Sequence, residues 1–126
     1  MNPELPAIDD TPIWNAMLSV FNSQAITVAL ELEVFEGLTE PASVEAISNK
    51  LGYSQRGMKA LLPMLKVQGL LDKHKGEYQL NNLSRAYMLK DSPYYWGPFF
   101  SRRAETLPNY KMILENIRDG ETVEAR

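Results

Sequence analysis

The segment that decides the fold runs over residues 43–80 and reads SVEAISNKLGYSQRGMKALLPMLKVQGLLDKHKGEYQL. Ser43 and Ser54 each precede a run with apolar residues at helical spacing, and serine is a favoured N-cap residue. Alternating residues on both sides of Lys75-Gly76 then predict a short β-hairpin. Pro63 falls inside the second helix, where it should remove a hydrogen bond and bend the helix. The order helix, turn, helix, hairpin predicts a winged helix.

The segment before this motif is helical in composition from Pro12 to about Phe35, with Thr11-Pro12 as a favourable start. Its apolar residues occupy nearly all sides of the helix, so more than one surface must cover it. A second copy of the chain or a further domain is expected to do so. The residues predicted to form a dimer interface are Trp14, Met17, Leu18, Phe21 and Ile26.

After the hairpin we expect a helix capped by Asn82, an aromatic-rich segment from Ser92-Pro93, and a last helix from about Pro108 to Gly120. The predicted fold class is mainly α: a winged helix-turn-helix with a small hairpin wing, plus long N-terminal and C-terminal dimerisation helices. The predicted organisation is an extended arm over residues 1–11, one domain over residues 12–120 and a frayed tail over residues 121–126.

Composition excludes several kinds of site. The chain has no cysteine and one histidine, which leaves no disulfide, no thiol nucleophile and no multi-histidine metal site. No apolar run approaches the ~20 residues of a membrane-spanning helix, and the acidic, proline-containing start is unlike a targeting signal. We therefore expect a cytoplasmic protein without membrane contact, and we predict no catalytic, cofactor-binding or metal-binding residue. Glutamates such as Glu31, Glu33 and Glu36 are interpreted as solvated side chains without a catalytic role.

Charge is unevenly distributed along the chain. Residues 1–49 carry eight acidic side chains and no basic one, whereas residues 50–90 carry eight basic and two acidic side chains. A basic winged helix suggests a DNA-binding transcriptional regulator as an alternative function. The acidic first third would repel a duplex, and few residues could read bases, so nucleic acid is the less favoured partner. The DNA-contact candidates under this alternative are Gln55, Arg56, Lys59, Lys73 and Lys75, with Lys66 on the same helix face.

Four stretches together resemble a known family: AITVALELEVFEGL (25–38), SVEAISNKLGYSQRGMKALLPMLKVQGLL (43–71), GEYQLNNLSRAYMLKDSPYYWGP (76–98) and LPNYKMILENIRDGE (107–121). They are similar to the N-terminal dimerisation domain of S-adenosylmethionine-dependent O-methyltransferases, which include plant phenolic and bacterial polyketide or carotenoid enzymes. Two features depart from the family pattern. Residues 80–84 read LNNLS where the family has L-T-x-x-S, and Pro63 is unexpected.

This resemblance implies a homodimer interlocked through the first helix, and a roof over the pocket of a small-molecule acceptor bearing an aromatic, polyketide or polyene hydroxyl. The residues that it suggests for the acceptor pocket are Trp14, Phe21, Trp96, Phe99 and Phe100. S-adenosylmethionine is expected only in a full-length family protein, because the seven glycines here are isolated and form no Gly-x-Gly fingerprint. We therefore expect no Rossmann-like catalytic domain in these residues and no catalysis by this chain alone. A further alternative is a stand-alone protein that regulates a separate methyltransferase.

Overall fold

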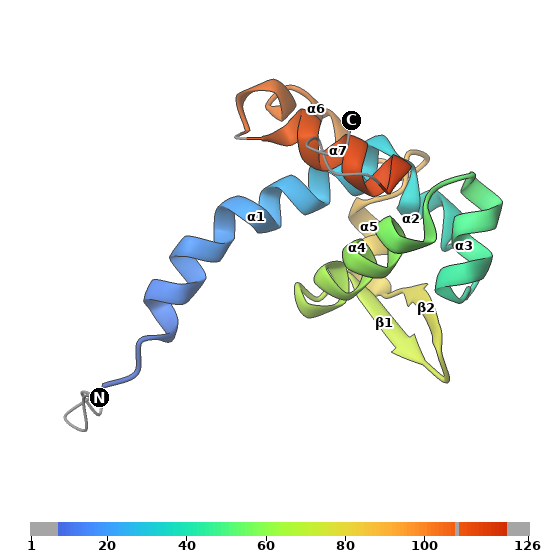
Figure 1. Cartoon of the computed structure of the whole chain (residues 1–126), viewed down its shortest axis with the longest axis horizontal. Coiled ribbons are helices and arrows are strands. Elements are labelled where there is room, and N and C mark those ends of the chain that lie inside the picture. The colour runs from blue at the N-terminus through green and yellow to red at the C-terminus, as the bar shows by residue number, and fades with distance from the viewer. Residues whose placement is uncertain (1–7, 108, 121–126) are drawn as a thin grey trace.

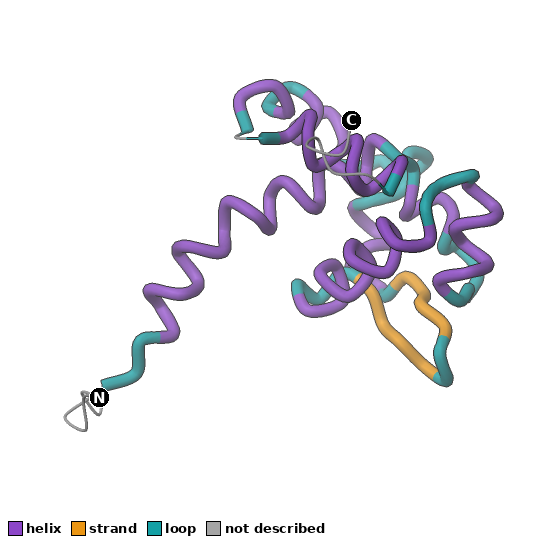
Figure 2. Tube along the Cα trace, viewed as in Figure 1, coloured by secondary structure: helices purple, strands orange, loops and turns teal. Residues whose placement is uncertain are grey.

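The computed structural model describes residues 8–107 and 109–120, and shows a small helical body from which the first helix projects (Figure 1). The N-terminal half of α1 extends away from the other helices, and the two strands form a hairpin at the edge of the body (Figure 2). Predictions for residues 1–7, Pro108 and residues 121–126 lie outside the described residues. The elements in chain order are α1 (Thr11–Glu31), α2 (Val34–Gly37), α3 (Val44–Leu51), α4 (Gln55–Val67), β1 (Leu71–His74), β2 (Glu77–Leu80), α5 (Asn82–Tyr87), α6 (Gly97–Ser101), η1 (Ala104–Thr106) and α7 (Tyr110–Asp119).

Both predicted serine caps are confirmed. The Ser43 hydroxyl accepts a hydrogen bond from the Ala46 N–H at 3.1 Å, and the Ser54 hydroxyl accepts one from the Gly57 N–H at 3.0 Å. Each bond satisfies a backbone donor that the first helical turn would otherwise leave unpaired. Pro63 lies inside α4, as predicted, with its ring on the exposed side of the helix.

The predicted hairpin is also confirmed. Strands β1 and β2 pair antiparallel with Leu71 opposite Leu80. Lys75 and Gly76 both have positive φ, at 52° and 82°, which matches a two-residue turn that favours glycine at its second position. Tyr78 exchanges two backbone hydrogen bonds with Ala42, so the hairpin is tied to the residues just before α3.

A single hydrophobic core joins the second half of α1 to α2, α3, α4 and the hairpin. Its largest fully buried apolar side chains are Phe35, Leu38, Ile47, Met58, Leu61, Leu62, Leu65 and Leu71. Each side chain of this size stabilises the folded chain by about 1.5–3 kcal/mol relative to exposure. None of the described helices has the length and apolar character that crossing a bilayer requires.

The prediction that the first helix continues to about Phe35 is wrong. The helix ends at Glu31, and Glu33 takes the left-handed conformation with φ of 62° before α2 begins. Leu32, Val34 and Phe35 are all buried, because the turn directs successive apolar side chains into the body. No glycine or proline marks this turn, so local sequence signals do not reveal it.

Two other boundaries differ from the predictions. Thr11 is the first residue of α1 rather than the end of an extended arm. The N–H of Thr11 donates a hydrogen bond to the Asp9 carboxylate at 3.0 Å. Asn81, not Asn82, caps α5 by accepting a hydrogen bond from the Ser84 N–H at 3.0 Å.

Helix α7 packs against α4 at unusually short range. A Cβ atom on Gly57 would lie 1.8 Å from the carbonyl oxygen of Ile117, so only glycine fits there. The N–H of Ser54 donates to the carbonyl oxygen of Arg118 at 3.0 Å. These contacts fix the C-terminal helix on the body. Helix α7 ends at Asp119, and Gly120, predicted to stop the helix, is its C-cap residue with φ of 78°.

Candidate functional site

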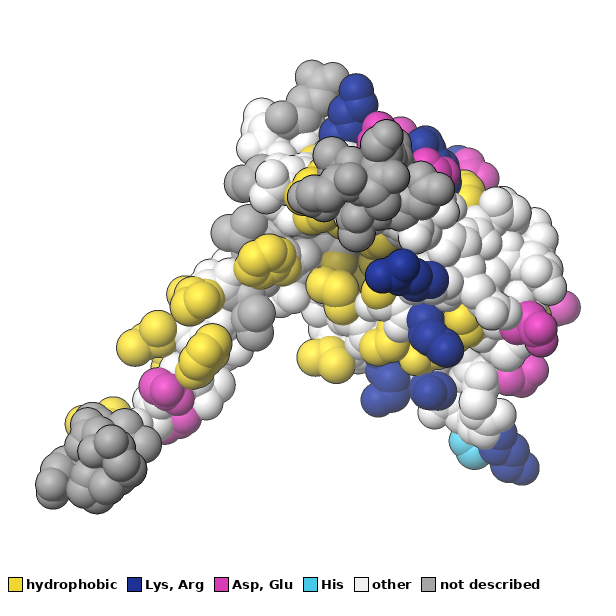
Figure 3. All heavy atoms as spheres, viewed as in Figure 1, with side chains coloured by type: hydrophobic (Ala, Val, Ile, Leu, Met, Phe, Trp, Pro, Cys, Tyr) yellow, Lys and Arg dark blue, Asp and Glu magenta, His cyan; other side chains and the backbone are white. Residues whose placement is uncertain are grey.

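The projecting half of α1, residues 11–21, exposes large apolar side chains. Ile13, Trp14, Met17 and Phe21 have exposed fractions of 66%, 52%, 56% and 51%. They follow a spacing of one, three and four residues, which places them on one side of the helix. Figure 3 shows hydrophobic side chains along the projecting helix. Exposed apolar patches that are contiguous mark interaction surfaces more often than isolated exposed residues do.

This exposed stripe continues a stripe that is buried in the second half of the same helix. Ala25 and Val28 follow Phe21 at helical spacing on that side, and both are buried in the body. The projecting half therefore has the pattern of a core-facing helix without a core of its own. Among the described residues no other segment covers it.

The other predicted interface residues are placed differently. Ile26 is half-buried and packs against the core of its own chain, so it does not belong to the exposed stripe. Leu18 lies within α1, but its side chain is outside what the structure describes. The Trp14 indole N–H donates to the Asp10 carboxylate at 3.1 Å, which orients the ring along the helix start.

The predicted aromatic residues after α5 form a cluster. The rings of Trp96 and Phe99 lie 5.2 Å apart and those of Phe99 and Phe100 lie 5.6 Å apart, in edge-to-face arrangements. The Arg103 guanidinium lies 3.9 Å from the centre of the Phe99 ring. An apolar hollow of about 280 Å³ next to this cluster is lined by Leu83, Tyr87, Met88, Trp96 and Phe100. Trp14 and Phe21 line neither this hollow nor the cavity described next, so the structure does not bring all five acceptor candidates together.

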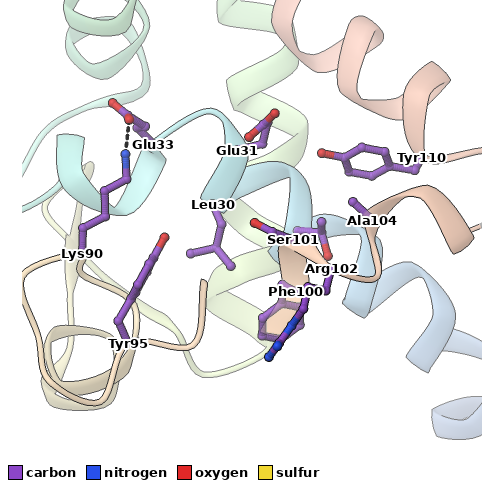
Figure 4. A pocket seen from close by; sticks show the side chains of 11 residues that line it. Leu30, Glu31, Glu33, Lys90, Tyr95, Phe100, Ser101, Arg102, Ala104 and Tyr110 are labelled. Carbon is purple, nitrogen blue, oxygen red and sulfur yellow. Dashed lines mark hydrogen bonds and ion pairs between the residues drawn. The ribbon is translucent and has the colours of Figure 1, made fainter. Parts of the chain in front are cut away.

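A larger cavity of about 430 Å³ lies between α1, the loop after α5 and the C-terminal segment (Figure 4). An ion pair between Lys90 and Glu33 is at one end, and the Tyr110 ring is at the other (Figure 4). The Lys90 N–H also donates to the Glu36 carboxylate at 3.2 Å. The lining residues are Thr27, Leu30, Glu31, Glu33, Lys90, Tyr95, Phe100, Ser101, Arg102, Ala104 and Tyr110.

Two tyrosines and one lysine of this cavity have raised pKa values. Burial raises the pKa of Tyr95 and of Tyr110 above the usual value for tyrosine, which keeps both phenols protonated. The hydrogen bond from Lys90 to Glu33 raises the pKa of the ammonium group, so Lys90 stays charged. The cavity offers polar contacts and aromatic walls.

The residues proposed for DNA contact are divided between α4 and the hairpin. Gln55, Arg56 and Lys59 are exposed on the first turns of α4. Lys73 lies on β1, with its ammonium nitrogen 5.2 Å from the centre of the Tyr78 ring, and Lys75 occupies the hairpin turn. Within residues 8–107 and 109–120, no group of three or more His, Asp or Glu side chains is placed to hold a metal ion.

Comparison with known proteins identifies the family. A sequence model of the O-methyltransferase dimerisation domain matches residues 14–90, which include most of α1, the segment from α3 to β2 and α5. The chain belongs to this family. The projecting half of α1 is thus the exposed apolar helix of a dimerisation domain.

Several members of the O-methyltransferase family resemble this chain. PigF, an S-adenosyl-L-methionine-dependent methyl transferase from a Serratia species, is 30% identical over 84 residues, which cover 66% of this chain and 24% of PigF. The structure of PigF with SAH matches with a TM-score of 0.70 over 76% of this chain and 29% of that chain. An O-methyltransferase family 2 protein from Planctomyces limnophilus, solved in complex with apigenin, matches with a TM-score of 0.77 and 27% identity over 88% of this chain and 33% of its own.

More distant solved structures share the fold of this chain. Human N-acetylserotonin methyltransferase in complex with SAM matches with a TM-score of 0.69 at 22% identity, over 91% of this chain and 34% of that chain. These matches support the predicted mainly helical fold with a small two-stranded sheet. The chain spans about a quarter of PigF and about a third of each solved relative.

Sequence reasoning missed two features of the site. The polar cavity was not predicted, because Glu33, Lys90, Tyr95 and Tyr110 come from separate segments. The requirement for glycine at position 57 was also missed, since the atom that it avoids belongs to Ile117 on another helix. Neither feature leaves a periodic signal in the sequence.

Proposed function

We propose that this chain forms a homodimer through the projecting half of α1 and the C-terminal helices, as the dimerisation part of an S-adenosylmethionine-dependent O-methyltransferase. The observation that carries the proposal is the exposed stripe of Ile13, Trp14, Met17 and Phe21 on a helix whose second half is buried. Water contact with such a stripe is unfavourable by about 25 cal/mol per Å². Covering it with a second copy would remove that penalty twice in one symmetric contact.

Light scattering after size-exclusion chromatography tests this proposal. The wild-type chain should have the mass of a dimer at micromolar concentration. Trp14→Ser should weaken the dimer at least about ten-fold, because buried tryptophans at interfaces carry a large share of the binding energy. Tyr94→Ser is the matched control, since Tyr94 is an exposed aromatic residue outside α1. A monomeric wild-type chain, or equal effects of the two substitutions, would contradict the proposal.

We further propose that Trp96, Phe99 and Phe100 belong to the roof of an acceptor pocket that is completed by a catalytic domain. The edge-to-face rings and the neighbouring apolar hollow support this assignment, because flat apolar walls suit an aromatic, polyketide or polyene acceptor. A roof of this kind would exclude water and orient the acceptor hydroxyl for methyl transfer. The segment from α3 to β2, which has the element order of a winged helix, would serve as its scaffold.

Tryptophan fluorescence can test the roof, because the chain has only two tryptophans. Trp14→Phe leaves Trp96 as the sole reporter. Titration with apigenin, the molecule in complex with the Planctomyces limnophilus relative, should then give saturable quenching after correction with free N-acetyltryptophanamide. Phe99→Ala should weaken the binding. Quenching that rises linearly with apigenin and is the same in the Phe99 variant would contradict the assignment.

We propose that donor binding and chemistry belong to another domain or chain. The isolated glycines support this assignment, since the usual cofactor loop needs clustered glycines at a helix N-terminus. Calorimetry with S-adenosylmethionine should therefore detect no micromolar binding to this chain. Micromolar affinity, or methylation of any acceptor by the purified chain, would contradict the assignment. A pull-down that recovers a separate methyltransferase would favour a regulatory partner chain over a fused domain.

A further inference from the structure

The exposed face of α4 carries an apolar stripe beside a basic stripe. Met58, Leu61 and Leu65 point into the core, and the opposite side of the helix is open to solvent. Val67 has an exposed fraction of 84% and Met64 one of 38%. The apolar stripe is Ala60, Pro63, Met64 and Val67, and the basic stripe is Arg56, Lys59 and Lys66. We call these seven residues the outer face of α4.

The projecting half of α1 has the same combination with the opposite charge. Asp9 and Asp10 precede its first turn, and the exposed apolar stripe follows them. Figure 3 shows acidic side chains near the start of the projecting helix, and apolar and basic side chains together on the body over α4. None of the three cations on the outer face of α4 forms an ion pair within the described residues. The two surfaces are therefore complementary in charge as well as both partly apolar.

The area of the projecting half alone is too small for a stable dimer. Four large side chains that each bury on the order of 200 Å² and are roughly half exposed offer about 400 Å². A stable interface needs about 800 Å² from each partner. Further exposed surface must therefore contribute, and the outer face of α4 presents apolar and basic side chains on the same view of the molecule (Figure 3).

The two surfaces also match in length. The projecting half spans about 15 Å and α4 about 18 Å at the rise of an α-helix. Within one chain the projecting half points away from the body, so it does not lie on the outer face of its own α4 (Figure 1). An outer face of α4 that contacts the projecting half must therefore belong to another molecule.

We infer that the outer face of α4 receives the projecting half of α1 from a second copy of the chain, with Asp9 and Asp10 set against the basic stripe. The exchange is reciprocal, so each copy gives one helix and receives one, and the contact closes as a two-fold dimer. The inference rests on the proposed homodimer and names the surface on which its helix docks. It also assigns a role to the cations of α4 that a winged helix would otherwise offer to phosphates.

The first test measures dimer dissociation by analytical ultracentrifugation of single variants. Val67→Asn should weaken the dimer at least about ten-fold, because each of the two copies loses the burial of a valine side chain. Because the Val67 side chain is highly exposed, this substitution should not change the fold of the monomer. Lys59→Glu should weaken the dimer about five-fold, since attraction becomes repulsion. The matched control is Lys75→Glu, which makes the same charge change on the hairpin turn and should leave the dimer unchanged.

The second test is rescue. Asp10→Lys should weaken the dimer, and the double variant Asp10→Lys with Lys59→Glu should recover most of the lost affinity. Fraying of the helix start in Asp10→Lys could not be repaired by a change on α4, so rescue reports direct pairing. Raising NaCl from 50 to 500 mM should weaken the wild-type dimer and have less effect on Lys59→Glu, because salt screens exposed charges.

The outcomes separate this inference from the proposed function. A monomeric wild-type chain overturns both. A dimer that Trp14→Ser weakens but Val67→Asn and Lys59→Glu leave unchanged overturns the docking surface alone. A mixed-sequence duplex DNA that binds the wild-type chain and not Lys59→Glu, while the dimer is unaffected, overturns it in favour of nucleic acid.

Discussion

The two halves of α1 have similar apolar patterns and opposite surroundings. In the second half, Ala25, Val28 and Ala29 are almost completely buried by α4 and the rest of the body. In the first half, Met17 and Phe21 continue the stripe but face solvent. Helical periodicity therefore identifies an apolar face of a helix. Whether that face is buried by the same chain depends on the arrangement of the whole molecule.

The largest expected difference between the halves comes from placing one charge in each. Val28→Asp buries a carboxylate in the core and should lower the free energy of unfolding by at least about 4 kcal/mol. Phe21→Asp should change the stability of the monomer by no more than about 0.5 kcal/mol, because its side chain is exposed there. Urea denaturation followed by circular dichroism, at concentrations where the chain is monomeric, measures both. Equal effects would show that the projecting half is covered in the monomer.

A second large effect is expected within the body, where α4 and α7 approach closely. Gly57→Ala should lower the free energy of unfolding by about 1–3 kcal/mol, as overpacked substitutions do, because the added methyl group overlaps the backbone of Ile117. Glycine to alanine normally stabilises a helix interior by about 0.5–1 kcal/mol. A more stable Gly57→Ala protein in the same urea experiment would therefore contradict the close approach of the two helices.

A smaller difference is expected from one pair of alanines, one in each half of α1. Ala29→Gly should lower the free energy of unfolding by about 1 kcal/mol, from helix propensity alone. Ala16→Gly makes the same change in the projecting half, where Ala16 is exposed. It should reduce helical circular dichroism slightly and leave the urea midpoint unchanged. A shifted midpoint for Ala16→Gly would mean that the two halves unfold together.

The smallest expected effect on stability concerns the start of α1. Hydrogen bonds from the Thr11 hydroxyl and N–H lower the pKa of Asp9 below 3.8. A depressed folded pKa stabilises the helix start above the ordinary value, and this contribution is lost as the pH falls through the folded pKa. Carboxyl-carbon NMR should show Asp9 titrating below the usual value for aspartate, and Thr11→Val should raise its midpoint. An Asp9 that titrates at its usual value would contradict the capping contact.

Local signals predicted much of the body. Ser43, Ser54 and the Lys75-Gly76 turn were identified because a cap or a turn depends on residues close in sequence. Gly120 marked the end of α7 for the same reason. The exposed dimer candidates Trp14, Met17 and Phe21 were found from periodicity together with chain size, and their role in a dimer remains a prediction.

Features that depend on distant residues were not predicted. The break at Glu33 has no glycine or proline, and it is accompanied by an ion pair to Lys90 on another segment. Ile26, a predicted interface residue, is half-buried because it packs against the core of its own chain. The cavity between Glu33 and Tyr110 likewise exists only after the chain has folded. Pro63 remains without a structural explanation beyond its exposed position on α4.

The end of α7 has an electrostatic consequence for α4. The carbonyl oxygen of Arg118, at the negative end of one helix dipole, accepts the Ser54 N–H directly before the positive end of the other. Opposite poles thus meet in the folded chain. DNA-reading helices commonly present this positive end to the duplex. Here the end already has an internal partner, so a phosphate would have to compete with a peptide carbonyl for it.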